Sequence, residues 1–176
     1  LQCVGCKPCS ITTGFAGAGA FSDGKLSLSP DVGGNLPDIL GYEKTAELIH
    51  ESDEIYLKFG ADRNVYGVDK QDVIREIRRR AIGANLKLVE CPIRHLGTEE
   101  GYKIYAKLQK HLMDEGAELI FNTMVEEILV EDGKAVGVRT DKGDVYYGSE
   151  VVSAVGREGA DWFKDKCEEV GIETTP

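Results

Sequence analysis

The sequence predicts an α/β fold, and three stretches of its second half carry this prediction. Residues 98–122 read as a helix, a glycine and then an apolar strand, which is the order that a right-handed crossover needs. Residues 124–147 read as three strands joined by turns, which is typical of a β-meander. Residues 150–155 form a β-rich run that ends at a glycine, as a buried parallel strand would. Together they predict a parallel sheet with a meander attached to it.

The first half of the chain is predicted to be less regular. Residues 1–40 are rich in Gly, Ser and Pro and read as loop. In residues 43–58 the apolar positions recur at a rough helical spacing. Asp69 is a suitable N-cap for a helix over about residues 70–84. Leu86 to Cys91 reads as a short strand, which the following proline ends.

In the second half each element has its own signal. The helix that begins at Thr98 is expected to end at Gly116, a typical C′ residue, and residues 118–122 follow as a strand. Asp132-Gly133 and Lys142-Gly143 are turns of the hairpin type. The apolar residues of the first meander strand do not alternate cleanly, which indicates a β-bulge.

Composition bounds the class of protein. The chain has 176 residues, of which 41% are hydrophobic and 30% charged, as in an ordinary globular protein of one domain or slightly more. No apolar run is long enough to span a bilayer, and no signal peptide is recognisable. Five cysteines, an odd number, point to a reducing compartment. We therefore expect a cytoplasmic protein without a membrane partner.

The charge balance leads to a prediction about partners. The net charge is −10, and phosphate contacts need clustered Lys and Arg, so nucleic acid is predicted to be excluded and the substrate to be a small molecule. Arg75, Arg78, Arg79 and Arg80 form one basic run, which we interpret as a solvated helix face. Nothing in the sequence predicts the oligomeric state.

Residues 12–25 are the most informative stretch, because they interleave glycine with alanine. Packed helices and strands do not need so many residues without side chains, whereas a backbone that approaches a flat or phosphorylated ligand does. A mobile surface loop is the alternative interpretation. The candidate cofactor-binding residues here are Gly14, Gly17, Ala18, Gly19, Ser22, Asp23 and Gly24.

This stretch also resembles a known family. It is similar to the corresponding segment of bacterial and archaeal FAD-dependent dehydrogenases of poorly defined substrate, which belong to the glutathione-reductase-like flavoproteins with two dinucleotide-binding domains. The resemblance covers nearly the whole chain and is carried by TTGFAGAGAFSDGKLSLSP (12–30), EIYLKFGA (54–61), CPIRHLGTE (91–99) and SEVVSAVGREG (149–159).

The resemblance implies a partial Rossmann-like FAD-binding domain with a β-meander and an inserted helical α+β segment. Residues 1–42 would form the cofactor-facing segment, residues 43–97 the substrate-side insertion, and residues 98–176 the helix, strand, meander and final strand of the FAD domain. The Gly-x-Gly-x-x-Gly unit with which such proteins begin does not occur in this chain. We therefore expect an internal fragment of a longer flavoprotein.

The resemblance also implies a function and site residues. The expected activity is hydride transfer through FAD to or from an unknown substrate, and NAD(P) is left open as the electron donor. Val125 would contact the adenine, and Ala154, Gly156 and Arg157 would lie under the cofactor at the last strand. The catalytic residues are not determined, and the candidates for a role beside the flavin are Arg94, His95 and Lys25.

Two alternatives rest on other residues. Cys3, Cys6 and Cys9 are spaced as ligands of an iron–sulfur cluster or of zinc, although a fourth ligand is missing from the run. A metal- or cluster-binding module is therefore one alternative, and thiols near a cofactor are another interpretation of the same residues. The Gly-rich stretch alone is also compatible with a non-catalytic nucleotide-binding domain.

Overall fold

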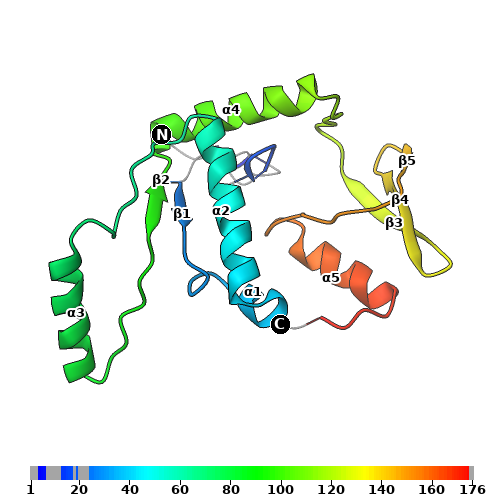
Figure 1. Ribbon diagram of the computed structural model, residues 1–176. Coiled ribbons are helices and arrows are strands. Elements are labelled where there is room, and N and C mark those ends of the chain that lie inside the picture. Colours follow the sequence, from blue (N-terminus) through cyan, green and yellow to red (C-terminus); the bar gives the residue numbers. More distant parts are fainter. Residues whose placement is uncertain (1–3, 7–12, 18, 20–23, 175–176) are drawn as a thin grey trace. The chain divides into compact units, whose positions relative to one another are not determined.

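The computed structural model describes residues 4–6, 13–17, 19 and 24–174, and the chain divides into two units. One unit consists of Leu1–Gly17 with Ala117–Pro176, and the other of Ala18–Gly116. We call them the split unit and the central unit, and each is described by itself. The described elements are helices and short strands, so the content is mixed and agrees with the α/β class (Figure 1).

The central unit is built around one antiparallel strand pair and two long helices. Its elements are β1 (Lys25–Ser27), α1 (Leu36–Leu40), α2 (Tyr42–Lys58), α3 (Gln71–Gly83), β2 (Ile93–His95) and α4 (Thr98–Asp114). β1 pairs with β2. The described core of this unit is small: Ala61, Leu96 and Ile104 are buried, and Leu26, Tyr56, Leu57 and Phe59 pack against them.

Helix α3 lies apart from the other helices of the central unit, at the end of two extended arms (Figure 1). The arms meet at an isolated antiparallel bridge between Tyr66 and Ile93, in which the two residues exchange backbone hydrogen bonds of 2.8 and 3.0 Å. Farther out, Arg78 of α3 forms an ion pair with Glu90 of the returning arm. The excursion that carries α3 therefore leaves and rejoins the unit at one place.

The described part of the split unit consists of a meander and one helix. Its elements are β3 (Val125–Glu131), β4 (Lys134–Thr140), β5 (Val145–Tyr147) and α5 (Ala160–Glu169). The strands pair in the order β3-β4-β5, and the β3–β4 register shifts twice, so the predicted meander and its irregularity are confirmed. At the β3–β4 turn Asp132 and Gly133 both have positive φ, 49° and 76°, as a type I′ turn requires.

Helix positions agree with the sequence better than isolated strand positions do. The helices expected over 43–58, 70–84 and from Thr98 onward are found as α2, α3 and α4. The N-cap of α3 is Lys70 and not Asp69, and no side chain caps it. Within residues 1–40, expected to be loop, β1 and α1 are formed.

The predicted strands at 86–91, 118–122 and 150–155 are wrong. No strand is assigned in these stretches, and the second strand lies instead at Ile93–His95, where β1 pairs with it. A β-rich run becomes a strand only when a neighbour accepts its ladder hydrogen bonds. Among the described residues these three runs have no such neighbour, and the described strands contain no parallel pair. A Rossmann-like arrangement is therefore not observed in this part of the chain.

None of the described helices has the length and apolar character needed to cross a membrane. The assignment of functional domains to residues 1–42, 43–97 and 98–176 remains a prediction.

Candidate functional site

Three of the sequence-predicted site residues meet on the β1–β2 ladder. Lys25 lies directly opposite His95, and Leu26 lies opposite Arg94. Opposed residues of an antiparallel pair share one face of the ladder, so Lys25 and His95 occupy one face and Arg94 the other. The ring of His95 packs edge-on against Tyr66, with centroids 5.1 Å apart. The ladder thus separates an exposed cation and an imidazole from a buried guanidinium.

Arg94 holds three segments of the central unit together. Its side chain is buried, and its Nε and Nη2 donate to the two carboxylate oxygens of Asp53 on α2 at 2.5 and 2.7 Å. Its Nη1 donates to the carbonyl oxygen of Asp62 at 2.6 Å. The hydrogen bonding of Arg94 to the Asp53 carboxylate raises the pKa of Arg94, so this cation stays charged. The geometry gives Arg94 a positioning role, and a direct contact with substrate remains a prediction.

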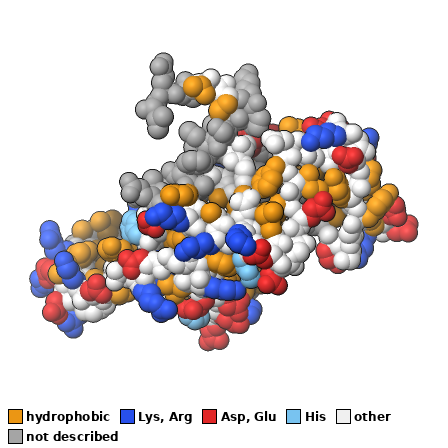
Figure 2. Space-filling model, turned by 90° about the horizontal axis from the view of Figure 1, so that it is seen from above, with side chains coloured by type: hydrophobic (Ala, Val, Ile, Leu, Met, Phe, Trp, Pro, Cys, Tyr) orange, Lys and Arg blue, Asp and Glu red, His pale blue; other side chains and the backbone are white. Residues whose placement is uncertain are grey.

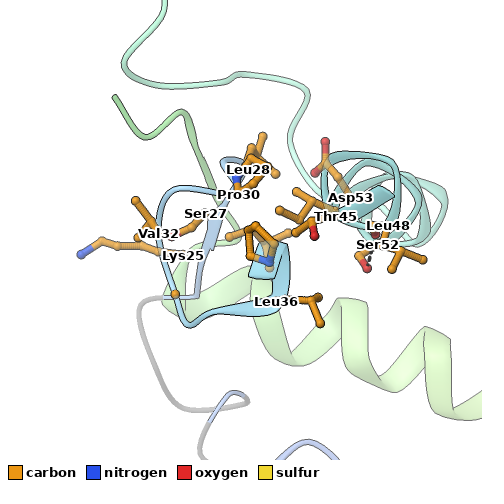
Figure 3. A pocket seen from close by; sticks show the side chains of 14 residues that line it. Lys25, Ser27, Leu28, Pro30, Val32, Leu36, Thr45, Leu48, Ser52 and Asp53 are labelled. Atoms are coloured by element: carbon orange, nitrogen blue, oxygen red, sulfur yellow. Dashed lines mark hydrogen bonds between the residues drawn. The ribbon is translucent and has the colours of Figure 1, made fainter. Parts of the chain in front are cut away.

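A cavity of about 450 Å³ lies between β1, the loop that follows it, and α2 (Figure 3). Its wall is mainly apolar. In Figure 3 the side chain of Lys25 extends away from the α2 side chains. The named lining residues are Leu28, Pro30, Val32, Leu36, Leu48 and Ile49, with Thr45, Ser52 and Asp53 as the polar side chains on α2.

The polar side chains that α2 contributes to this cavity are already engaged within the protein. The hydroxyls of Thr45 and Ser52 each donate to the carbonyl oxygen four residues earlier, Gly41 and Leu48, at 2.8 Å. The carboxylate of Asp53 accepts from Arg94. Such a cavity is suited to an apolar or flat group more than to a charged one. The sequence analysis missed it, because the apolar stripe of α2 gave no signal that Leu48 and Ile49 would line a cavity.

At two of the candidate positions, packing within the protein explains why the residue is glycine. A Cβ on Gly24 would lie 2.9 Å from Cβ of Leu96, and a Cβ on Gly19 would lie 3.1 Å from the hydroxyl of Tyr105. Gly24 also accepts a 2.7 Å hydrogen bond from the backbone N–H of Leu96. These close approaches explain both glycines without a ligand.

Gly14 is different, because no described residue approaches the position of its missing Cβ. Its φ is 97°, a Cβ there would meet no atom within 4 Å, and its carbonyl accepts from the backbone N–H of Gly17 in a tight turn. The backbone is therefore bare on its outer side at this turn. The neighbouring candidates Ala18, Ser22 and Asp23 lie outside the described residues.

The remaining candidates lie in the split unit. Val125 begins β3 and is paired with Thr140. Gly156 has φ 62° and open space around its Cα, and Ala154 and Arg157 beside it are exposed. Their expected contacts with a cofactor remain predictions.

The cysteine motif is only partly described. Cys6 is exposed, while Cys3 and Cys9 lie outside the described residues. Within the described part of the chain no group of three or more His, Cys, Asp or Glu side chains is arranged to hold a metal ion. The metal-binding alternative therefore has no support from these residues.

Comparison with known proteins finds no matching family model. The chain is similar to the tRNA uridine 5-carboxymethylaminomethyl modification enzyme MnmG of Streptococcus mutans, with 35% identity over 107 residues, which cover 53% of the chain and 17% of that enzyme. The enzyme of the same name from Streptococcus pyogenes is 37% identical over 65 residues, which cover 36% of the chain and 10% of that enzyme. The chain thus spans less than a fifth of the length of these relatives.

This similarity corrects the prediction about partners. By their names the relatives act on tRNA, so the prediction of a small-molecule substrate without nucleic acid is wrong. The prediction was based on the net charge of −10, which is a sum over the whole chain and does not show where positive charge is concentrated. A local run such as residues 70–87, with six Lys or Arg and two Asp or Glu, keeps its own field within a Debye length, about 8–10 Å.

Proposed function

We propose that this chain is part of an FAD-dependent enzyme that acts on a uridine of tRNA, with hydride transfer through the flavin. The observation that carries the proposal is the 35% identity over 107 residues to an enzyme that modifies tRNA uridine. A second support is the resemblance of four segments of the sequence to FAD-dependent flavoproteins. Both supports concern part of a longer enzyme, so the substrate and the activity are proposed for the full-length protein.

Two of the candidate glycines support the proposal of a flavin nucleotide. At Gly14 and at Gly156 φ is positive, and no atom of the described residues lies within 4 Å of where a Cβ would be. Bare backbone of this kind lets N–H and C=O groups approach a ring or a phosphate that a side chain would hold away. Arg157, next to Gly156, adds a cation suited to a phosphate group.

The isoalloxazine of FAD would supply the redox step when it is bound. The chain's own residues would bind and orient. Lys25 provides a positive charge on the exposed face of the β1–β2 ladder, and His95 beside it provides an imidazole able to accept or donate a proton. Arg94 fixes the position of this ladder against α2 through Asp53.

The first test is the absorption spectrum of the full-length protein purified without air. Flavin bands are expected, and they should decrease in Gly14→Ala, because the added Cβ occupies the bare side of the turn. Gly34→Ala is the matched control: its φ is 102° and it too has no atom within 4 Å, so the backbone strain is alike. A protein that stays colourless after addition of FAD contradicts the proposal.

The second test concerns tRNA. Nucleosides of tRNA from cells that lack the gene are analysed by mass spectrometry, and loss of one modified uridine is expected. The gene with Gly34→Ala should restore it, and the gene with Gly14→Ala should restore it less. An unchanged set of modified uridines contradicts a tRNA uridine substrate, and flavin binding is then judged by the spectrum alone.

A further inference from the structure

Helix α3 has no buried residue, although it is thirteen residues long. Its apolar side chains Val73 and Ile77 are 51% and 45% exposed. Figure 2 shows hydrophobic and basic side chains together at the left end of the molecule, where α3 lies in Figure 1. Most helices owe their stability to packing of one face, so a helix whose apolar side chains are at best half-buried lacks part of the packing that would normally hold it.

The charge of this region is opposite to that of the rest of the chain. Residues 70–87 contain six Lys or Arg and two Asp or Glu, a net charge of +4, which leaves −14 for the remaining residues. Concentrated positive charge on one exposed element is the electrostatic footprint of a nucleic-acid contact. The negative remainder would also repel RNA elsewhere and so direct it to this helix.

The arginines of α3 are held only by weak partners. Arg75 pairs with Asp72 and Arg79 with Glu76, each three residues earlier on the same helix. Arg78 pairs with Glu90. All these side chains are exposed, and Arg80 forms no ion pair with a described residue. Exposed pairs of this kind contribute little and are screened by salt, so a phosphate group can replace the carboxylates.

The positions of these arginines suit a polyphosphate backbone. At 100° per residue Arg75, Arg78 and Arg79 fall on one side of the helix, with Val73 and Ile77 on another side and Arg80 at the edge of the apolar stripe. Guanidinium groups bind phosphate oxygens in a bidentate manner and are weakly hydrated, which makes arginine the preferred residue for nucleic-acid contacts.

We propose that α3 is a docking element for the phosphate backbone of tRNA, an inference that rests on the proposed function. A second copy of this acidic chain also offers opposite charge to α3. The similarity to tRNA-modifying enzymes favours RNA as the partner. To test a second copy as the alternative partner, the oligomeric state of each variant is measured alongside by size-exclusion chromatography.

The test measures binding of a fluorescently labelled tRNA transcript to the full-length protein by anisotropy, at several salt concentrations. The variant carries Arg75→Gln, Arg78→Gln and Arg79→Gln, the three arginines that share one side of α3. Its affinity at low salt is expected to fall at least tenfold, and the slope of log Kd against log salt to decrease by roughly 2, because three phosphate contacts are lost. The matched control carries Lys103→Gln, Lys107→Gln and Lys110→Gln, which removes the same charge from exposed positions of α4. The control should stay within twofold of the natural protein.

If the natural protein binds tRNA and the α3 variant has the same affinity and the same salt slope, the docking inference is overturned. The proposed function is then unaffected. Absence of tRNA binding by the natural protein contradicts the tRNA part of the proposed function itself. A change of oligomeric state in size-exclusion chromatography, without a change in tRNA affinity, overturns the inference in favour of a second copy.

A measurement without any variant covers the case in which the substituted helix unfolds. Trypsin cleaves after exposed Arg and Lys, so α3 and α4 both offer cleavage sites in the natural protein. Saturating tRNA is expected to slow cleavage after Arg75, Arg78 and Arg79 and to leave cleavage after Lys103 and Lys110 unchanged. Equal rates at α3 with and without tRNA overturn the inference.

Discussion

Arg94 and the arginines of α3 have the same side chain in opposite surroundings. Arg94 is 4% exposed, and two carboxylate oxygens and a backbone carbonyl share its guanidinium. The side chain of Arg79 is 80% exposed, and its partner is a single glutamate on the same helix. The first arrangement ties segments of the fold to one another, and the second leaves the cation accessible. The comparison teaches that burial and the number of acceptors separate a positioning arginine from one available to a partner.

The largest effect is expected at the buried pair. Arg94→Met should lower the free energy of unfolding by about 3–5 kcal/mol, because the carboxylate of Asp53 is then buried without a partner. The measurement is urea-induced unfolding, with the loss of helix monitored by circular dichroism. In the double variant Arg94→Met with Asp53→Leu much of the loss should be recovered. A loss below about 1 kcal/mol for the single variant contradicts the role given to Arg94.

The next effect concerns the ladder that carries Arg94. Gly24→Ala should cost about 1–3 kcal/mol, because its Cβ would lie 2.9 Å from Cβ of Leu96 in the core. Gly97→Ala is the control, since Gly97 also has positive φ, 76°, but no atom within 4 Å. Equal losses in the two variants would mean that backbone strain alone accounts for both.

A smaller, pH-dependent effect is expected at Tyr105, a half-buried residue of α4. Burial, and then the hydrogen bond with Tyr56, raises the pKa of Tyr105 to about 12. An unfolded tyrosine ionises near pH 10, so the contribution of Tyr105 is fully present below about pH 10 and is lost as the pH rises toward 12.

Unfolding midpoints between pH 9 and 12 measure this effect. Tyr105→Phe should make the alkaline decrease shallower, whereas Tyr102→Phe, at a 56% exposed position of the same helix, should leave it unchanged. An identical decrease in both variants contradicts a contribution from Tyr105.

The smallest effect is expected on α3. Arg79→Gln should change the free energy of unfolding by less than about 1 kcal/mol, because exposed ion pairs are screened and contribute little. Urea unfolding of Arg79→Gln and of Arg94→Met under the same conditions compares the two losses of unfolding free energy directly. A loss as large as that of Arg94→Met would remove the distinction between the two kinds of arginine.

The sequence predicted the elements whose partners lie nearby in the chain. Helices α2, α3 and α4 follow local apolar spacing, and the β3–β4 turn follows Asp132-Gly133, whose backbone conformation only a few residue types adopt. The runs 118–122 and 150–155 have strand composition as well, but composition does not supply a hydrogen-bonding neighbour. Local signals therefore succeeded where the partner was local and failed elsewhere.

For the candidate site, too, the sequence could not predict contacts between residues that lie far apart along the chain. The sequence suggested Arg94, His95 and Lys25, yet only the ladder shows that Lys25 and His95 are opposed and that Arg94 faces Asp53. The partner of Arg94 lies forty-one positions earlier, and no pattern in the sequence links the two. Glycine content likewise did not distinguish Gly24, which makes room for Leu96, from Gly14, which faces open space.

The Tyr66–Ile93 bridge has a consequence for the history of the chain. Because the two ends of the excursion meet there, the segment bearing α3 can be gained or lost in a single insertion or deletion without moving β1, β2 or α2. Replacing residues 68–90 with an Asn-Gly turn should leave the remaining ladder folded. The segment that bears α3 can therefore change or be lost in evolution independently of the rest of the central unit.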